Sequence, residues 1–544
     1  MLIKKSDIGG EIISILTRGM YLDPKDALRE YVQNGVDAGA TSISIRIRQD
    51  TIVVIDNGTG MDKTCMRSAL RVGISDKNLS QSVGFMGIGI YSSFHLCDEL
   101  NIYSKSKGES PNILTFKFKE MRGELEKQRE LRYTAHFDTK KLIALQDLLE
   151  KNIFLEELKN DDFPKIGTRV EMIGIEPTFF QTLTKFNEVS EYLEKVIPLP
   201  FSPKFTYGKE IQNNIQQICK NNNHNFSLVN LELQINEEKK TLYRPYVDDF
   251  FEPSPLPPKF ITLKSKSEFF GIAWGCLNSS KNSIKNLNRG FIIKKHGFSI
   301  GNREDLLTYF VRQIYYNRYI GEIIVVHPKL LPNASRSEFE YSPLRIDFQN
   351  ILKQMAIEYN QYADTYQEEL KASEKLDEAI RFLKESRSQY EFYLDNLDHL
   401  LILFWNSKEF SKTIKTRKSK NRYNGSDLQR ADEVIKQLDA LAKEIKEIIE
   451  QKKNKSKKSA AHKSESEIAS DVSLIPEESD SSSIQEFDSL LQLIESLGLE
   501  LNKELKALFE LIDENYIRVS SDDKDDYINK LLKLKNDFEE MIEE

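Results

Sequence analysis

The spacing of apolar residues near the start of the chain predicts one helix followed by a β-hairpin. Apolar residues recur every three or four positions from Leu28 to Val36, directly after Asp23 and Pro24, which suit the N-cap and first turn of a helix. Residues 41–56 then alternate or run β-branched on either side of a polar pair. We therefore expect a helix from about residue 24 to 38, and two paired strands after it.

The middle of the chain, residues 176–341, alternates between strand-like and helix-like stretches that proline-rich loops separate. Aromatic and β-branched runs mark three strand candidates at Phe260–Leu263, Phe269–Trp274 and Gly290–Ile293. This part of the chain is therefore expected to form a second α/β region.

The last third of the chain is helical in pattern and highly charged. A heptad series from Met355 to Leu383 is interrupted by two polar residues, whereas a second series from Val434 to Ile448 is not interrupted. Such seams are typical of coiled coils between two chains and also of antiparallel hairpins within one chain. The pattern alone does not separate these two alternatives.

These patterns predict an α+β protein whose first part is an α/β sandwich, with helices on one face of a mixed sheet. A charged, serine-rich tract in the last hundred residues reads as a disordered linker, and two amphipathic helices, at roughly 484–514 and 521–543, follow it. The expected parts are an N-terminal domain (1–175), a middle domain (176–343), a helical coiled-coil region (344–450), the linker (451–483) and the C-terminal helices (484–544).

Composition narrows the class of protein. The net charge of −8 and the pI near 5.7 give no general attraction to nucleic acid. The four cysteines are scattered and form neither a zinc pattern nor a disulfide framework. The longest apolar run, Leu400–Trp405, is far too short to span a bilayer, and the first residues contain no signal-peptide core. We therefore expect a cytoplasmic protein without a membrane partner.

Polar residues on the first helix form one candidate site. Glu30, Asn34 and Asp37 fall at positions i, i+4 and i+7, so all three share a face beside the apolar stripe. A solvated helix face would look the same. The pattern therefore marks these three residues as candidates without deciding their role.

A second signal follows the hairpin, where Asp56 ends a strand and two glycines, Gly58 and Gly60, come directly after it. A carboxylate in this position accepts hydrogen bonds from a flat ligand, and glycine lets the backbone come close to that ligand. The alternative is a plain Asn-Gly turn.

A third signal is the glycine-rich run from Gly84 to Gly89, which is expected to open an apolar helix that ends near Leu96. Glycines at a helix start expose N–H donors and the positive end of the helix dipole, which together favour an anion. The spacing is not that of a dinucleotide fingerprint, and the sequence contains no GxxxxGK[ST] P-loop.

In this order, the three blocks resemble the GHKL ATPase superfamily, which includes gyrase, the ninety-kilodalton (HtpG-like) heat-shock chaperones, histidine kinases and MutL. Gly167–Glu171, on a later predicted strand, resembles a fourth block of that superfamily. The resemblance implies Mg2+-dependent hydrolysis of ATP, with Glu30 as the general base and Asn34 as the magnesium ligand.

The resemblance also implies the nucleotide contacts. Asp56 would accept a hydrogen bond from the adenine amino group with water-mediated support from Thr168, Gly60 would let the base approach, and Met61 would pack near the ring. Asp37 shares the polar face and is included as a nucleotide-site residue. The phosphates would be cradled by the glycine-rich run, namely by Gly84, Phe85, Met86, Gly87, Ile88 and Gly89.

Two further residues are candidates. Lys77 lies in a short predicted lid and would contact phosphate, unless it is an ordinary solvated lysine. Asn288–Ile293 and Leu331–Glu338 resemble the middle domain of the heat-shock chaperones, which implies that Arg336 reaches the γ-phosphate from another domain. Its alternative is a surface pair between Arg336 and Glu338 or Glu340.

The resemblance favours an ATP-gated, homodimeric clamp of the chaperone type that acts on an unknown client protein. The alternative is a DNA-associated clamp like MutL or the MORC proteins, in genome maintenance or in defence against foreign DNA. This alternative is supported by Gly73–Lys77, which resembles the corresponding motif of the MORC proteins. A third hypothesis is a pocket that binds ATP as a switch without turnover. The basic run Lys412–Arg422 is a candidate contact for nucleic acid, but a solvated hairpin tip is the favoured interpretation.

Overall fold

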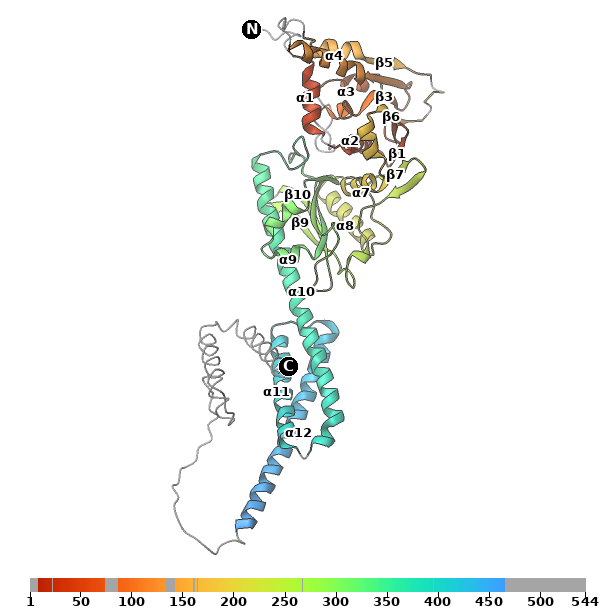
Figure 1. The fold of residues 1–544 in the computed structure, drawn as a ribbon. Helices are drawn as coiled ribbons and strands as arrows, with labels where there is room; N and C mark the ends of the chain where they lie inside the picture. Colours follow the sequence, from red (N-terminus) through yellow and green to blue (C-terminus); the bar gives the residue numbers. More distant parts are fainter. Residues whose placement is uncertain are drawn as a thin grey trace. The chain divides into compact units, whose positions relative to one another are not determined.

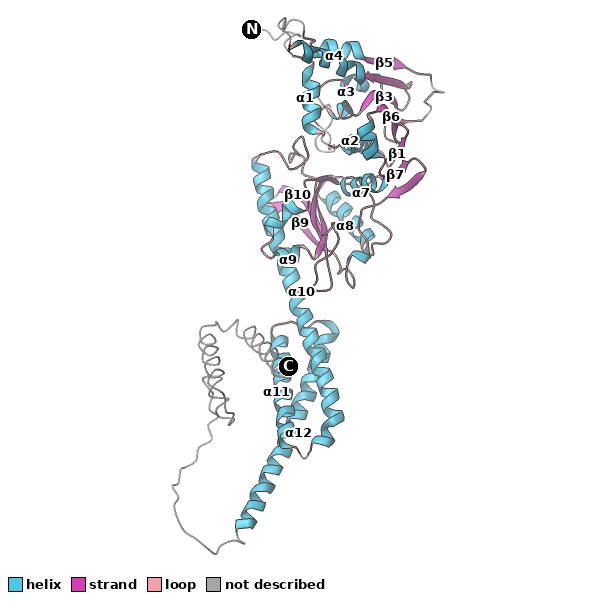
Figure 2. Ribbon diagram, in the orientation of Figure 1, coloured by secondary structure: helices cyan, strands magenta, loops and turns pink. Residues whose placement is uncertain are grey.

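The computed structural model describes residues 8–21, 23–73, 87–133, 142–159, 162–163, 165–266, 268–394 and 396–464. Its described residues up to Gln451 form one compact unit. The chain combines helices with two mixed sheets and continues into long helices, which confirms the predicted α+β class (Figures 1 and 2). No described helix is both long enough and apolar enough to cross a membrane.

The N-terminal sheet has eight strands in the order β5-β4-β3-β6-β2-β1-β7-β8, and all neighbours are antiparallel except β1 and β7. Its strands are β1 (Ser42–Arg48), β2 (Thr51–Asp56), β3 (Cys97–Lys105), β4 (Asn112–Lys117), β5 (Ile153–Glu157), β6 (Gly167–Ile175), β7 (Asn230–Ile235) and β8 (Glu238–Leu242). The predicted hairpin is confirmed as β1 and β2, whose register pairs Arg48 with Thr51.

Helices cover the face of this sheet on which alternate residues such as Ile43, Ile45 and Ile47 are buried. These helices are α1 (Glu11–Met20), α2 (Lys25–Asp37), α4 (Phe118–Leu131), α5 (Leu145–Asn152) and α7 (Phe186–Val196), and α3 (Lys63–Ala69) and α6 (Pro177–Leu183) lie between them in the chain. The predicted first helix is confirmed as α2. Its Leu28 and Val32 are completely buried, which stabilises the fold by roughly 1.5–3 kcal/mol each.

The hydrogen-bonded sheet does not stop at residue 175, where the first domain was expected to end. Strands β7 and β8 extend it, and Leu231, Leu233 and Ile235 join the same core as β1. Without these two strands, β1 would be an edge strand, and the N–H and C=O groups on one side of its backbone would have no partner in the sheet. The N-terminal sheet is therefore completed by residues from the expected middle domain.

The expected apolar helix from the glycine-rich run to Leu96 is wrong over the residues that are described. Gly89–Tyr91 is a 3-10 helix followed by turns, and β3 begins at Cys97. The backbone bonds run from residue i to i−3, as from Tyr91 N–H to the Ile88 carbonyl at 2.9 Å. Residues three apart then face the same way, so the rings of Tyr91 and Phe94 are both buried, Tyr91 against Phe116 of β4 and Phe94 against Phe118 of α4.

The middle region contains a five-stranded sheet in the order β12-β11-β13-β10-β9. Its strands are β9 (Lys259–Ser265), β10 (Glu268–Leu277), β11 (Gly290–Lys295), β12 (Phe298–Ile300) and β13 (Tyr319–Val325), so all three strand predictions are confirmed. Helix α8 (Gly208–Asn221) packs on one face of the sheet, and α10 (Pro343–Gln389) packs on the other. The described residues after β8 also form the short helix α9 (Gln313–Tyr316) and the 3-10 helices Asp248–Phe250, Glu304–Tyr309 and Tyr390–Tyr393.

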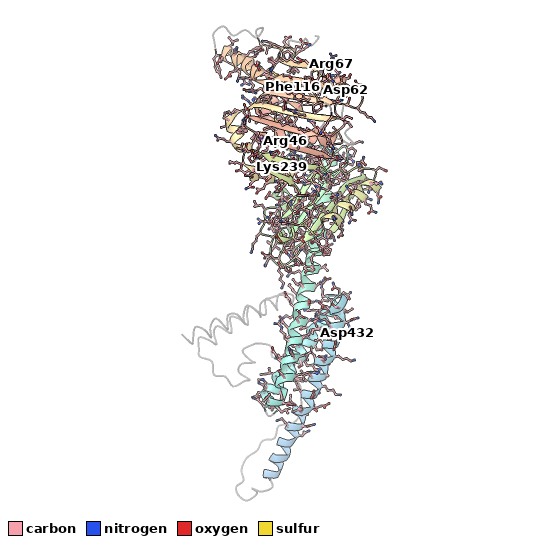
Figure 3. The ribbon with its side chains drawn as sticks, turned by 90° about the vertical axis from the view of Figure 1, so that its right-hand side faces the viewer. Arg46, Asp62, Arg67, Phe116, Lys239 and Asp432 are labelled. Carbon is pink, nitrogen blue, oxygen red and sulfur yellow. The ribbon has the colours of Figure 1, made fainter. Side chains whose placement is uncertain are left out.

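The heptad seams pack within the chain. Helices α10, α11 (Leu397–Ser419) and α12 (Gly425–Ser464) share a core that contains Leu376, Leu383 and Leu438. Ion pairs join Lys415 to Asp439 and Lys418 to Asp432, which Figure 3 labels on α12, so α11 and α12 run antiparallel. The structure therefore contains the intrachain alternative for these seams.

The expected linker was wrong over its first part, because residues 451–464 continue α12. The tract is rich in lysine, which favours helix, and its high charge alone did not reveal this. The rest of the expected linker and the two C-terminal helices lie outside the described residues.

Candidate functional site

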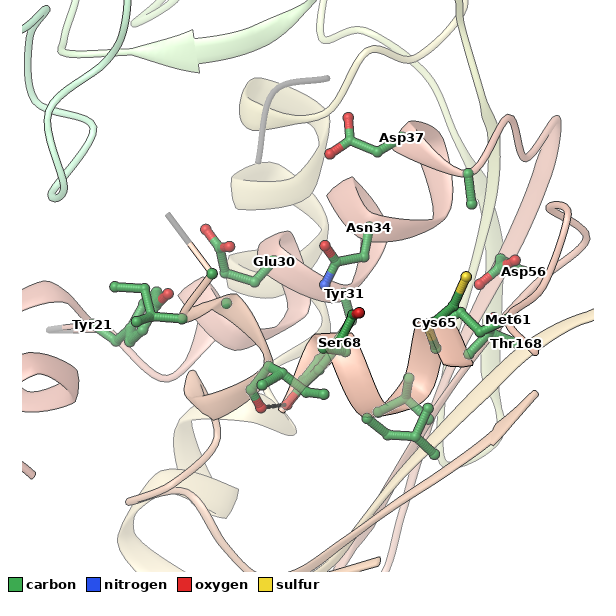
Figure 4. A pocket seen from close by; sticks show the side chains of 18 of the residues that line it. Tyr21, Glu30, Tyr31, Asn34, Asp37, Asp56, Met61, Cys65, Ser68 and Thr168 are labelled. Carbon is green, nitrogen blue, oxygen red and sulfur yellow. Dashed lines mark hydrogen bonds between the residues drawn. The ribbon is translucent and has the colours of Figure 1, made fainter. Parts of the chain in front are cut away.

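A cavity of about 450 Å³ lies beside α2 and is lined by every predicted site residue that the structure describes (Figure 4). Its walls come from α2, the end of β2, α3, the 3-10 helix at Gly89, β6 and a loop of the middle region. The predicted residues that line it are Glu30, Asn34, Asp37, Asp56, Gly60, Met61, Gly87, Ile88, Gly89, Thr168 and Arg336. Lys77, Gly84, Phe85 and Met86 lie outside the described residues.

Helix α2 presents three of these side chains to the cavity. Glu30, Asn34 and Asp37 follow one another along the helix, as Figure 4 shows. The helix starts where Asp23 accepts a hydrogen bond from the Lys25 N–H at 2.9 Å, and its opposite face is anchored in the core. The polar face predicted from sequence therefore lines a cavity, although Glu30 itself is only 6% exposed.

Asp56 lies at the far end of the cavity, where β2 ends beside Thr168 of β6. Its Oδ1 accepts a hydrogen bond from the Gly58 N–H at 2.8 Å. Burial raises the pKa of the Asp56 carboxyl above its ordinary value, and the backbone N–H groups of Gly58 and Thr168 offset part of this increase. The carboxylate is thus held by the turn that follows it.

Ser104 lies behind this end of the cavity, in contact with the lining residues Met61 and Thr168, and the sequence did not single it out. Its buried hydroxyl accepts a hydrogen bond from the Met61 N–H at 2.8 Å, donates to the Gly167 carbonyl at 3.1 Å and lies 3.0 Å from Thr168 Oγ1. Its only signal in the sequence is a small polar residue near the end of a strand. Strands β3 and β6 and the glycine turn therefore meet at one serine.

Gly60 is required here by the protein's own backbone. Its φ is +68°, and a Cβ atom at this position would lie 2.0 Å from the Lys105 carbonyl oxygen. Any side chain would therefore push the turn away from β3. This close contact adds to the implied role of Gly60 in admitting the base.

The glycine-rich run meets α2 at the other end of the cavity. A Cβ atom on Gly89 would lie 2.7 Å from Glu30 Oε2, so glycine is what allows the two segments to touch. The Tyr31 hydroxyl donates to the Ile90 carbonyl at 3.1 Å and lies 2.7 Å from Ser93 Oγ. Tyr31 was not predicted as a site residue. Its hydrogen bonds hold the segment after Gly89 against the helix that carries Glu30.

Arg336 reaches the cavity from the middle region and binds Glu30. Its Nη2 and Nε lie 2.7 and 3.1 Å from Glu30 Oε1, and both side chains are largely buried. The alternative of a surface pair was wrong, because Arg336 binds Glu30 while Glu338 binds Arg345. A tight turn presents Arg336 with φ of 55°, and the Arg336 N–H donates to the Asn333 carbonyl at 3.0 Å.

Tyr21 also lines this end of the cavity and has no signal in the sequence. Burial, and after it the neighbouring Glu30 carboxylate, raise the pKa of the Tyr21 phenol above its ordinary value. The phenol therefore stays protonated beside Glu30 and Arg336.

The geometry of the cavity agrees with the family comparison. Residues 22–146 match the model of the histidine kinase-, DNA gyrase B- and HSP90-like ATPases. The N-terminal domain is therefore a member of the GHKL ATPase superfamily, as its sequence motifs predicted.

The individual relatives are of three kinds, a mismatch repair protein, a chaperone and a restriction enzyme. The DNA mismatch repair protein MutL of Borreliella afzelii is 25% identical over 268 residues, which cover 46% of this chain and 41% of MutL. The chaperone protein HtpG of Orientia tsutsugamushi is 25% identical over 134 residues, which cover 19% of this chain and 21% of HtpG. A candidate type II restriction enzyme, HgiDII of Herpetosiphon aurantiacus, is 33% identical over 117 residues and 19% of each chain. The chain thus spans less than half of the length of each of these relatives.

Proposed function

We propose that this chain binds ATP with Mg2+ in the cavity beside α2 and hydrolyses it to ADP and phosphate. The observation that carries the proposal is the convergence in one cavity of Asp56, the polar face of α2, the Gly87–Gly89 segment and Arg336. These groups come from four separate stretches of sequence.

The donors and acceptors of the cavity fit a purine nucleoside triphosphate. Its volume of about 450 Å³ lies within the usual range of roughly 300–1,000 Å³ for such sites. Asp56 offers a carboxylate acceptor to an exocyclic amino group at one end, and Ile102 and Val170 supply apolar walls for a flat ring. At the other end, the Gly87–Gly89 segment lines the cavity and Arg336 supplies positive charge for phosphate.

The α2 face supplies the remaining groups. The side-chain oxygens of Asn34 and Asp37 are of the kind that Mg2+ prefers, and the ion, when bound, neutralises charge on the phosphates. Glu30 would take a proton from water as the water oxygen attacks the γ-phosphorus and the bond to the β-phosphate oxygen breaks. Arg336 would stabilise the charge that develops there, because a guanidinium has five N–H donors and only two of them hold Glu30.

The Glu30→Ala variant tests the catalytic part of this proposal. We expect ATP turnover to fall by about 10²–10⁴-fold, because a general base contributes roughly that factor. Nucleotide affinity, measured by isothermal titration calorimetry, should change little, since Asp56 and the glycine segment remain. The control is Glu191→Ala on the exposed face of α7, which should behave as wild type. Unchanged hydrolysis by Glu30→Ala would remove Glu30 from the role of base.

We further infer a nucleotide-gated homodimeric clamp of the chaperone type, supported by the chaperone-like motifs around Asn288 and Arg336. A second candidate is a clamp associated with DNA. It is favoured by the match to MutL, which covers 46% of the chain where the match to HtpG covers 19%. The two candidates use the same ATP site, and they differ in the partner that the clamp would enclose.

A further inference from the structure

Arg29, the neighbour of Glu30 on α2, reaches the middle region by a separate route. Its side chain is buried with 8% exposure, and its Nη2 donates to the Ser299 carbonyl on β12. Glu30 meets Arg336 on the cavity side at the same time. Two adjacent residues of one helix therefore contact two different segments of the middle region.

Those two segments are themselves joined by a backbone hydrogen bond. The N–H of Gly301, two residues after Ser299, donates to the Arg336 carbonyl at 3.0 Å. The contacts close a ring that runs from Arg29 to Ser299, along β12 to Gly301, on to Arg336, and back through its guanidinium to Glu30. The position of Arg336 relative to Glu30 is thus fixed from both sides.

Strand β12, which forms one side of this ring of contacts, is fixed by hydrogen bonds and by burial. The Ser299 hydroxyl donates to the Lys195 carbonyl at the end of α7 at 2.6 Å, and Ile300 pairs with Ile293 of β11. Phe298 and Ile300 are buried in the cores on either side. A change in the distance between α2 and β12 would therefore move the backbone at Arg336.

The ring also sets two cations near one carboxylate. Burial, followed by the charge of Arg336, lowers the pKa of Arg29 from its ordinary value, so the fold holds Arg29 at some electrostatic cost. An apolar residue could fill the same space without that cost, but it could not donate to the Ser299 carbonyl.

We propose that Arg29 is a positioning residue that places the Arg336 guanidinium for ATP hydrolysis by fixing β12 against α2. The proposal rests on the ATPase function proposed above. Arg29 acts through Arg336 and touches neither nucleotide nor the reacting atoms. It follows that loss of Arg29 should slow the chemical step and leave nucleotide binding almost intact.

The test is a double-mutant cycle on the full chain with ATP and Mg2+. We expect Arg29→Met to lower kcat about tenfold and to change KM less than about twofold, whereas Arg29→Lys, which still has a donor, should recover part of the loss. In an Arg336→Ala background, Arg29→Met should have no further effect on kcat, because residues that act through one another are not additive. An equal loss in both backgrounds, or no loss in the wild-type background, overturns the proposal.

Two controls separate positioning from general damage. Arg318→Met removes another buried arginine, which donates to the Asn278 carbonyl and to Gln367 of α10, and it should lower stability without lowering kcat. Ser299→Ala removes the bond to Lys195 but keeps the carbonyl that Arg29 binds, and it should reduce kcat in the same direction in case Arg29→Met does not fold. A wild-type kcat after Ser299→Ala would then count against the relay. Absence of turnover by the wild-type chain overturns both the ATPase function and the positioning role, whereas a silent Arg29→Met in an active enzyme overturns only the latter.

Discussion

The carboxyl group of Asp56 determines how the affinity of the proposed adenine site should depend on pH. Burial raises its pKa, and a bound amino group would favour the ionised form because only that form is purely an acceptor. Nucleotide binding should therefore be strongest at pH values above the raised pKa of Asp56 in the nucleotide-free protein. It should weaken as the pH falls through that pKa. An ordinary, solvated aspartate would show this loss only at lower pH.

Asp56→Asn should remove both the affinity and its pH dependence. A hydrogen bond to a charged group contributes about 1.5–3 kcal/mol, so we expect ATP to bind roughly 10–100-fold more weakly at neutral pH. Titration calorimetry between mildly acidic and neutral pH would measure this. Asp50→Asn, in the turn at the opposite end of β2, is the matched control and should leave the pH profile unchanged. A variant at position 56 with wild-type affinity would contradict the assignment.

Gly89 provides a second test at the scale of one residue. A methyl group there would meet Glu30 Oε2, and that carboxylate has little room to move because Arg336 holds its other oxygen. We expect Gly89→Ala to lower kcat for ATP several-fold, with a smaller effect on affinity. Gly123→Ala on α4 meets no atom within 4 Å and should instead stabilise the fold by up to about 1 kcal/mol.

At the scale of elements, β13 carries a buried acid that organises the middle region. Glu322 lies 2.6 Å from Arg244 Nη1 and 3.1 Å from Lys294 Nζ, and it accepts a hydrogen bond from the Tyr246 hydroxyl at 2.9 Å. Burial disfavours its charge, but Arg244 and Lys294 outweigh burial and lower the pKa of Glu322 from 4.5 to about 2. The strand is therefore tied to its neighbours by charge as well as by apolar packing.

Glu322→Gln should destabilise the middle region by about 3–5 kcal/mol, because it leaves buried cations without their partner. Since the folded-state pKa is depressed, the contribution of Glu322 is complete above its unfolded pKa and is lost as the pH falls from about 4.5 toward 2. Urea unfolding of both proteins as a function of pH would measure this. The difference between wild type and variant should shrink over that interval, and a constant difference would refute the role of the ion pairs.

The elements that the sequence predicted best are those with local signals. Helix α2 combines a start signal at Asp23, which accepts a hydrogen bond from the Lys25 N–H, with an apolar period and a polar face, and β1 and β2 are joined by a two-residue turn. Strand β7, in contrast, pairs with β1 across about a third of the chain, as Ser42 with Asn230, and no local pattern indicates that partner. The glycine-rich run was mistaken for the start of an α-helix because glycine and apolar residues suit a 3-10 turn equally well.

The same distinction holds for the site. The helical spacing of Glu30 and Asn34, and the glycines after Asp56, predicted these three as site residues. Arg336 was predicted only because the motif around it resembles the middle domain of a known family. Ser104 and Arg29 contact backbone groups that are distant in sequence, so a single chain gives no hint of them. Their roles follow from the folded structure alone.

At the scale of the molecule, the partner of the proposed clamp is the main open choice, and the basic run Lys412–Arg422 bears on it. Two of its lysines, Lys415 and Lys418, are paired with aspartates of α12. This pairing reduces the charge available for phosphates and favours the chaperone type over the DNA-associated type.

Turnover should therefore rise with protein concentration, as expected of a site that is completed on association, and should not respond to duplex DNA. Steady-state ATPase assays over a range of protein concentrations, with and without DNA, would measure this. DNA-stimulated turnover that is lost at high salt, and on neutralising Lys412, Arg417 and Lys420, which form no ion pair with any residue that the structure describes, would instead support the DNA-associated clamp. Constant specific activity would contradict gating by dimerisation.

Helix α10 links the site to the helical region without a break. It starts seven residues after Arg336, packs its first half on the middle sheet and its second half against α11 and α12, and at 47 residues is about 70 Å long. A continuous helix transmits a tilt along its whole length, so a rotation of about 5° at the Arg336 end would swing the other end by about 6 Å. Hydrolysis at a single phosphate would in this way produce a displacement large enough to open or close the proposed clamp around a macromolecule.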